Sequence, residues 1–179
     1  MLYYALQVAT GKESAFVSHV NRLFPDLGLT HRLIHLTREL TIRRQGKYLK
    51  ETRPLFSSYL FLESNGKLAV GVIDKLKSVP DFYHFLKSNT NITPLSPSDV
   101  SILQHFLTMG PKVGSSLVIF DENDRIVVLE GPLKGLEGNI IKVDRRKKRA
   151  KIRVDFENSP MTIDLAFEVM EKETSIQKN

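Results

Sequence analysis

A glycine-rich segment between two β-branched runs constrains the fold of this chain more than any other feature. Residues 125–129 and 139–143 have the composition of strands, and residues 131–138 between them contain three glycines and a proline. Glycine tolerates positive φ and lets another backbone approach closely. Residues 150–156 alternate charged and apolar side chains, which is typical of a strand with one buried face. The sequence therefore predicts a small barrel-like unit of short strands here.

This unit resembles the KOW motif, a strand–loop–strand module of transcription elongation factors and some ribosomal proteins. The matching residues are Val127–Val128, Gly131–Gly135, Gly138 and Ile140–Asp144. The motif marks a module rather than a function, so the remaining residues must indicate which kind of protein carries it.

The first 110 residues have a mixed strand and helix pattern. Strands are expected over residues 3–9, 32–42, 55–63 and 82–86, and a helix over 67–77. Thr10 and Glu13 have the spacing of a capping box, which predicts a helix that Pro25 ends. Ser96, with Pro97 after it, predicts another helix that ends at Gly110–Pro111.

The order of these elements predicts an α+β chain with two domains. The first, residues 1–110, is an α/β sandwich with a mainly antiparallel sheet flanked by helices. Residues 111–117 form a linker, residues 118–173 form a small SH3-like β barrel, and residues 174–179 form a tail.

The whole chain resembles the NusG family of transcription elongation factors. The N-terminal match runs from Tyr3–Leu6 through Gly11 to Arg53–Leu62, and the KOW-like unit completes it. The resemblance implies an N-terminal NGN-like domain that binds the clamp of RNA polymerase, and a KOW domain that recruits partners.

Three aromatic residues match or lie near the polymerase-facing patch of that family. They are Phe56, Tyr59 and Phe82, and the resemblance implies that they bind RNA polymerase. From the alternation alone, ordinary sheet core is the favoured interpretation of all three, because most aromatic residues in strands are buried. Ser57–Ser58 replaces the Pro-Gly or Pro-Asn that is usual in the family, which leaves the exposure of Tyr59 open.

Two groups of cations are candidates for binding nucleic acid. The first fills seven of the nine positions 145–153 and consists of Arg145, Arg146, Lys147, Lys148, Arg149, Lys151 and Arg153. The second lies on a basic hairpin and contains Arg43, Arg44 and Lys47. Adjacent cations repel one another, which an anionic partner such as leader RNA or non-template DNA would offset. The alternatives are a solvated turn and neutralisation by nearby acidic residues.

Other functional classes have little support in the sequence. The chain has no cysteine, and His31 and His35 lie in a strand-like context whose spacing does not converge on one metal ion. No catalytic motif is present, so we expect neither an enzyme nor a cofactor. No apolar run approaches the ~18 residues of a membrane span, and the N-terminal residues do not read as a signal peptide. We expect a cytoplasmic monomer that does not bind membranes.

The sequence is interpreted as a specialised NusG paralogue similar to LoaP or RfaH, which suppresses pausing and termination on particular operons. Glu157–Pro160 stands where general NusG proteins usually carry a Phe-Gly-Arg segment that contacts termination factor and ribosome. One alternative is a general NusG-type factor that couples polymerase to those partners. Another is a ribosome-associated KOW protein that binds RNA. Since the strands of the KOW-like unit are rich in β-branched residues, we expect it to be a stable barrel.

Overall fold

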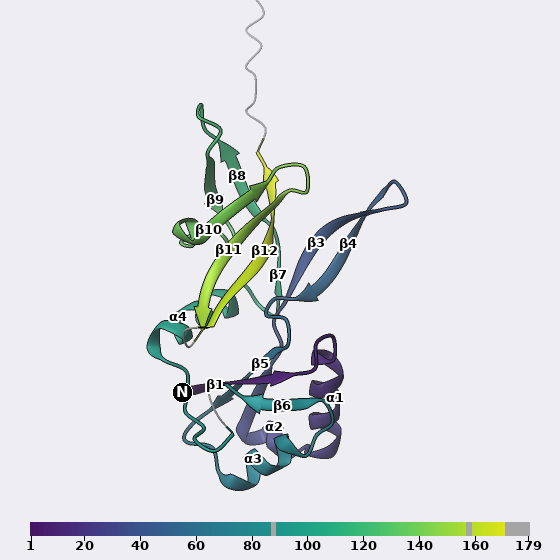
Figure 1. Cartoon of the computed structure of the whole chain (residues 1–179), viewed down its shortest axis with the longest axis vertical. Coiled ribbons are helices and arrows are strands. Elements are labelled where there is room, and N and C mark those ends of the chain that lie inside the picture. Colours follow the sequence, from purple (N-terminus) through teal and green to yellow (C-terminus); the bar gives the residue numbers. More distant parts are fainter. Residues whose placement is uncertain (87–88, 157–158, 171–179) are drawn as a thin grey trace, which may run out of the picture.

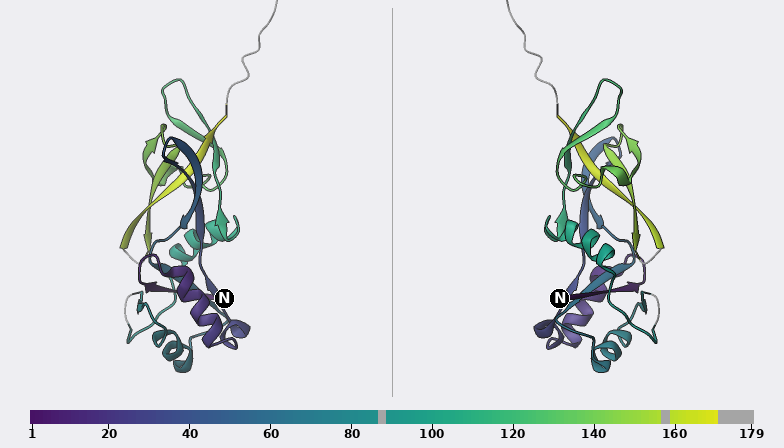
Figure 2. Two further views of the ribbon diagram at one scale, coloured as in Figure 1. Left: turned by 90° about the vertical axis from the view of Figure 1, so that its right-hand side faces the viewer. Right: turned by 90° about the vertical axis from the view of Figure 1, so that its left-hand side faces the viewer.

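The computed structural model describes residues 1–86, 89–156 and 159–170. Figure 1 shows an elongated molecule, with β1, β5, β6 and helices α1, α2 and α3 at one end and the strands β8 to β12 at the other. A β-hairpin projects from the N-terminal part and runs alongside the second sheet (Figure 2). The α+β class predicted from the sequence is confirmed.

The N-terminal sheet is antiparallel, with its strands in the order β2 (His31–Ile34), β5 (Tyr59–Ser64), β1 (Leu2–Val8) and β6 (Phe82–Phe85). Its helices are α1 (Glu13–Leu23), α2 (Leu27–Thr30) and α3 (Val70–Lys77). Both faces of β1 are buried because its side chains alternate between two cores. Tyr4, Leu6 and Val8 pack with the helices, whereas Tyr3 and Ala5 belong to a second core on the opposite face.

The projecting hairpin consists of β3 (Thr37–Arg44) and β4 (Lys47–Pro54). Its two-residue turn has positive φ at Gln45 (50°) and Gly46 (78°), which matches the twist of a tight hairpin. The single strand predicted over 32–42 is wrong, because the chain changes sheets after β2. The predicted strand over 55–63 is also shorter, since β5 begins only at Tyr59.

The C-terminal sheet has five strands, in the order β10 (Ile140–Asp144), β11 (Arg149–Phe156), β12 (Ser159–Val169), β8 (Ser116–Phe120) and β9 (Ile126–Glu130). The pairing of β8 with β12 is parallel, and the other pairings are antiparallel. The three strands predicted in the glycine-rich unit are confirmed. Gly131 and Gly135 have φ values of +94° and +84°, and the loop between β9 and β10 ends in a short 3₁₀ helix, η1 (Glu137–Asn139).

Helix α4 (Pro97–Leu107) begins as predicted. Ser96 Oγ accepts a hydrogen bond from the Asp99 backbone N–H, and Pro97 occupies the first turn. The segment 111–117, predicted as a linker, contains β7 (Lys112–Val113), which pairs in parallel with β3. Lys112 and Lys50 each lie 2.7 Å from the Glu39 carboxylate. These hydrogen bonds lower the pKa of Glu39 to about 2 and hold the segment against the hairpin.

The predicted capping box of α1 is wrong. Glu13 is buried, and its Oε1 accepts a hydrogen bond of 2.7 Å from the Ser58 backbone N–H. Thr10 Oγ1 lies 2.6 Å from Ser58 Oγ instead of capping the helix. Ser58 has a φ of 69°, an uncommon conformation for serine that these contacts hold in place. Glu13 and Thr10 therefore fix the turn before β5 through their contacts with Ser58.

Replacing Glu13 with alanine is expected to lower the free energy of unfolding by about 1–3 kcal/mol, because it leaves the buried Ser58 N–H without its acceptor. Glu13→Gln keeps an acceptor oxygen and is the matched control, with a smaller expected loss. Urea unfolding of both variants measures the difference. Equal losses would show that this hydrogen bond does not stabilise the turn.

Two apolar cores hold the chain together. The smaller lies between the N-terminal sheet and helices α1, α2 and α3. The larger contains buried residues of both halves, among them Leu55 and Phe61 from the N-terminal half and Ile152 and Val154 from β11. The C-terminal sheet is therefore packed onto the N-terminal sheet through a shared core, with α4 alongside.

Candidate functional site

Phe56, the first of the three candidate polymerase-binding aromatics, is covered by the C-terminal sheet. Its side chain is 2% exposed. The Phe156 ring at the end of β11 lies edge-on at 5.1 Å, and the Phe61 and Phe106 rings lie at 5.2 and 5.8 Å between centroids. Edge-to-face aromatic contacts of this kind are stabilising. In this arrangement no ligand can reach Phe56.

The other two candidates do not join Phe56 in one patch. Tyr59 is half-buried at the start of β5 and packs against the larger core. Phe82, on the edge strand β6, belongs to the smaller core, with its ring 6.4 Å from Phe16 and 5.5 Å from Phe85. Their role in binding polymerase stays a prediction.

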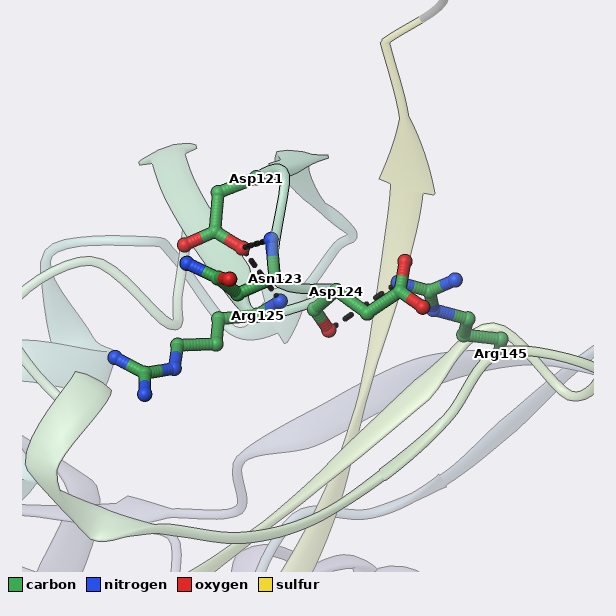
Figure 3. A network of polar contacts seen from close by, with 5 residues as sticks. All are labelled: Asp121, Asn123, Asp124, Arg125 and Arg145. Carbon is green, nitrogen blue, oxygen red and sulfur yellow. Dashed lines mark hydrogen bonds and ion pairs between the residues drawn. The ribbon is translucent and has the colours of Figure 1, made fainter.

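Four of the seven cations at 145–153 have acidic partners in the same half of the chain. The Arg145 guanidinium lies 3.0 Å from Asp124 Oδ1 and also donates to the Asp124 carbonyl (Figure 3). It also lies over the Phe120 ring, 3.7 Å from the ring centroid. The remaining pairs are Lys147 with Asp144 at 3.9 Å, Lys151 with Asp164 at 3.5 Å and Arg153 with Asp155 at 3.7 Å. Neutralisation by acidic residues, one of the sequence alternatives, therefore holds for part of the cluster.

Other candidate cations remain exposed and, within the described part of the chain, form no ion pair. They are Arg146 and Lys148 in the turn between β10 and β11, and Arg43, Arg44 and Lys47 at the tip of the β3–β4 hairpin. Exposed cations without acidic partners keep their full charge for a phosphate. These five residues are the best placed of the predicted set.

The structure brings the two predicted cation groups together. Arg149 Nη2, at the start of β11, donates a 2.8 Å hydrogen bond to the Thr41 carbonyl of β3. A groove of about 790 Å³ lies at this junction, with Arg43 and Tyr48 of the hairpin on one side and Arg146 and Lys148 on the other. Members of both groups therefore line one groove, whereas Arg44 and Lys47 at the hairpin tip lie outside its lining.

Tyr48 is the residue of this groove that the sequence analysis missed. Its ring is 70% exposed, and the Arg43 guanidinium lies 5.9 Å from the ring centroid. An exposed tyrosine next to cations is typical of surfaces that stack on bases. The signal in the sequence was a tyrosine directly after Lys47 in a polar hairpin.

The structure gives no support for a metal site or a membrane span in the residues it describes. No group of three or more potential metal-ligating side chains occurs there. Nδ1 of His31 lies within hydrogen-bonding distance of the Thr30 hydroxyl, and Nδ1 of His35 lies within hydrogen-bonding distance of the Ser14 hydroxyl. No helix in this part of the chain is long and apolar enough to cross a membrane. Glu157 and Asn158, of the loop interpreted above, lie outside the described residues.

Comparison with known proteins identifies the family. A family model described as transcription termination factor nusG matches residues 1–104, which include all three candidate aromatics. The chain belongs to the NusG family. The transcription termination/antitermination protein NusG of Rickettsia felis is 24% identical over 133 residues, which cover 72% of this chain and 66% of that protein. The Thermus thermophilus protein of the same name is 22% identical over 177 residues, which cover 92% and 95%.

The fold of this NusG-family chain is also found in a solved structure. The structure described as the domain interaction in Thermotoga maritima NusG has a TM-score of 0.55 and 16% identity, and covers 92% of this chain and 93% of that one. At this identity the likeness shows the fold alone.

Proposed function

We propose that this chain is a transcription factor that binds RNA polymerase and suppresses pausing and termination. The observation that carries the proposal is the family match over residues 1–104, because this segment contains Phe56, Tyr59 and Phe82. Relatives that align over most of the chain are termination/antitermination proteins by name. Tyr59 and Phe82 are both partly exposed in this arrangement, whereas Phe56 is buried, so Tyr59 is one of the two candidates that polymerase can reach directly.

The packed arrangement adds a condition to this function. Phe56 contacts polymerase only after the C-terminal sheet has moved away, because the Phe156 ring of that sheet lies 5.1 Å from the Phe56 ring in this arrangement. The chain then exists in a packed form and a form that exposes Phe56, and the measured affinity for polymerase depends on the fraction of the second.

The proposed factor acts on particular operons and is directed to them by nucleic acid. The support is the set of exposed cations without acidic partners in the described residues, together with the absence of Gly-Arg after Phe156 in the sequence. Leader RNA is the proposed nucleic acid, because unpaired RNA bases and phosphates are both accessible to arginine and tyrosine side chains.

Transcription with purified polymerase tests the proposal. The chain is expected to lengthen transcripts through terminators on templates that carry a responsive leader, and Tyr59→Ala is expected to reduce this effect at least severalfold because it removes the half-exposed ring. Tyr83→Ala is the matched control, since Tyr83 is 57% exposed on β6 and belongs to neither core.

Equal read-through on every template would favour the general NusG-type factor. Absence of any effect on polymerase, together with co-sedimentation with ribosomes, would overturn the proposal in favour of a ribosome-associated protein. Equal loss in the Tyr59 and Tyr83 variants would remove Tyr59 from the contact surface.

A further inference from the structure

We propose that the groove between the β3–β4 hairpin and the β10–β11 turn binds single-stranded RNA, and that it exists only while the two halves of the chain are packed together. The inference rests on the nucleic-acid role in the proposed function and deepens it. It assigns one composite site where the sequence indicated two separate basic clusters.

Both halves of the chain build the walls of this groove. Thr41, Arg43 and Tyr48 come from the hairpin, and Arg146, Lys148 and Arg149 come from the C-terminal sheet. The hydrogen bond from Arg149 Nη2 to the Thr41 carbonyl joins the walls across 108 positions of sequence. In Figure 1 the hairpin stands beside the upper ends of β11 and β12, and β3 contacts β12. If the halves separate, neither wall alone makes a groove.

The charge of the groove fits a phosphate backbone. Arg43, Arg146, Lys147 and Lys148 line it, and among the described residues the one ion pair that these four form is that of Lys147 with Asp144, at 3.9 Å. Glu168 is the acidic residue in the lining. A strand that contacts these four cations releases condensed counterions, so the logarithm of its affinity should fall with the logarithm of salt concentration with a slope of roughly −3, at ~0.7 per contact.

Tyr48 favours an unpaired strand over a duplex. Its exposed ring lies within the same lining as the cations, and Arg43 lies on its face. A base that is free to leave its stack can pack on such a ring, whereas the bases of an RNA duplex are paired and stacked inside the helix. Phosphate contacts along the groove and one stacked base then act on the same strand.

The composite site couples RNA binding to packing of the two halves. A ligand that binds only the packed form stabilises that form by its binding free energy. RNA in the groove therefore helps to hold the C-terminal sheet over Phe56. A ligand that binds only when Phe56 is uncovered lowers the affinity for RNA, and RNA lowers the affinity for that ligand by the same factor.

Fluorescence anisotropy with the full chain and a labelled single-stranded RNA of about 12 nucleotides tests the site. Arg43→Ala/Arg146→Ala is expected to weaken binding at least tenfold and to reduce the salt slope by about 1.4, at ~0.7 per lost contact. The control is Arg22→Ala/Arg125→Ala, which removes the same charge from exposed arginines, one in each half, outside the groove. Tyr48→Ala should also weaken binding of the single strand about tenfold.

Three outcomes would overturn the inference. The first is equal affinity of the groove variant and the control. The second is equal or tighter binding of an RNA duplex or of single-stranded DNA of the same sequence. The third is unchanged RNA affinity in Phe156→Leu and Phe156→Ala chains that circular dichroism shows to be folded and that NMR shows to have separated halves. Polymerase binding of the groove variant should stay at the wild-type level, which separates failure of this site from failure of the proposed function.

Discussion

Phe156→Ala is expected to raise the affinity of the full chain for RNA polymerase by up to about 100-fold. Phe156 packs edge-on against Phe56 at 5.1 Å and lies 5.7 Å from Phe61, and it is 2% exposed. Removing a buried phenylalanine ring costs about 3 kcal/mol or more, and 1.4 kcal/mol corresponds to a factor of ten. Because the lost contact joins the two halves, the cost increases the fraction of chains in which Phe56 is uncovered.

Equilibrium binding to purified polymerase measures this effect, and NMR spectra of the variant show whether the halves have separated. Phe167→Ala is the control, since Phe167 is equally buried but its ring packs on Phe120 within the C-terminal sheet, at 6.0 Å. It should destabilise that sheet without raising polymerase affinity. If the halves separate in Phe156→Ala and polymerase affinity does not change, Phe56 is not part of the contact surface.

Gly131→Ala should destabilise the C-terminal half by about 2–5 kcal/mol. Gly131 has a φ of +94°, and a Cβ atom there would lie 2.6 Å from Ser116 Cα and 2.9 Å from the Ser115 carbonyl oxygen. Left-handed backbone costs a non-glycine residue about 1–2 kcal/mol, and forcing a methyl group into closely packed backbone adds about 1–3 kcal/mol. The shift would also disturb the hydrogen bond from the Leu133 N–H to Ser116 Oγ.

Gly135→Ala separates the conformational cost of a left-handed backbone from the steric cost of the added methyl group. Gly135 has nearly the same φ, +84°, but a Cβ atom there would meet nothing within 4 Å. Only the conformational cost of about 1–2 kcal/mol is therefore expected. Urea unfolding of both variants gives the difference, which is the cost of the close approach to β8. Equal destabilisation would show that the backbone at Ser116 yields to the added methyl group.

Local signals in the sequence were sufficient for several elements. Ser96 and Pro97 begin α4 as predicted, because capping involves residues only three positions apart. The β-branched runs became β9, β10 and β11, and glycines occupy the positions with φ of +94° and +84°. The same reasoning failed at Thr10 and Glu13, whose side chains bind Ser58 rather than the end of their own helix.

The candidate site depended on contacts that no local pattern shows. Composition identified Arg43 and Arg146 as members of basic clusters, but their shared groove depends on how β3 packs beside β12. The sequence likewise could not show that Phe156 would cover Phe56. A strand preference does not specify which sheet a strand joins, which is why one predicted strand became β2 and β3.

The sequence by itself determined the family, the α+β class, the position of the glycine loop and the excess of cations. The resemblance to NusG proteins indicated the family, and the class and the loop follow from residue preferences that act over a few neighbouring positions. Only the tertiary structure decided which cations have acidic partners, that members of two distant clusters line one groove, and that Phe56 is covered. These depend on packing between segments more than 100 positions apart, where the burial of aromatic rings and the pairing of charges outweigh local preference.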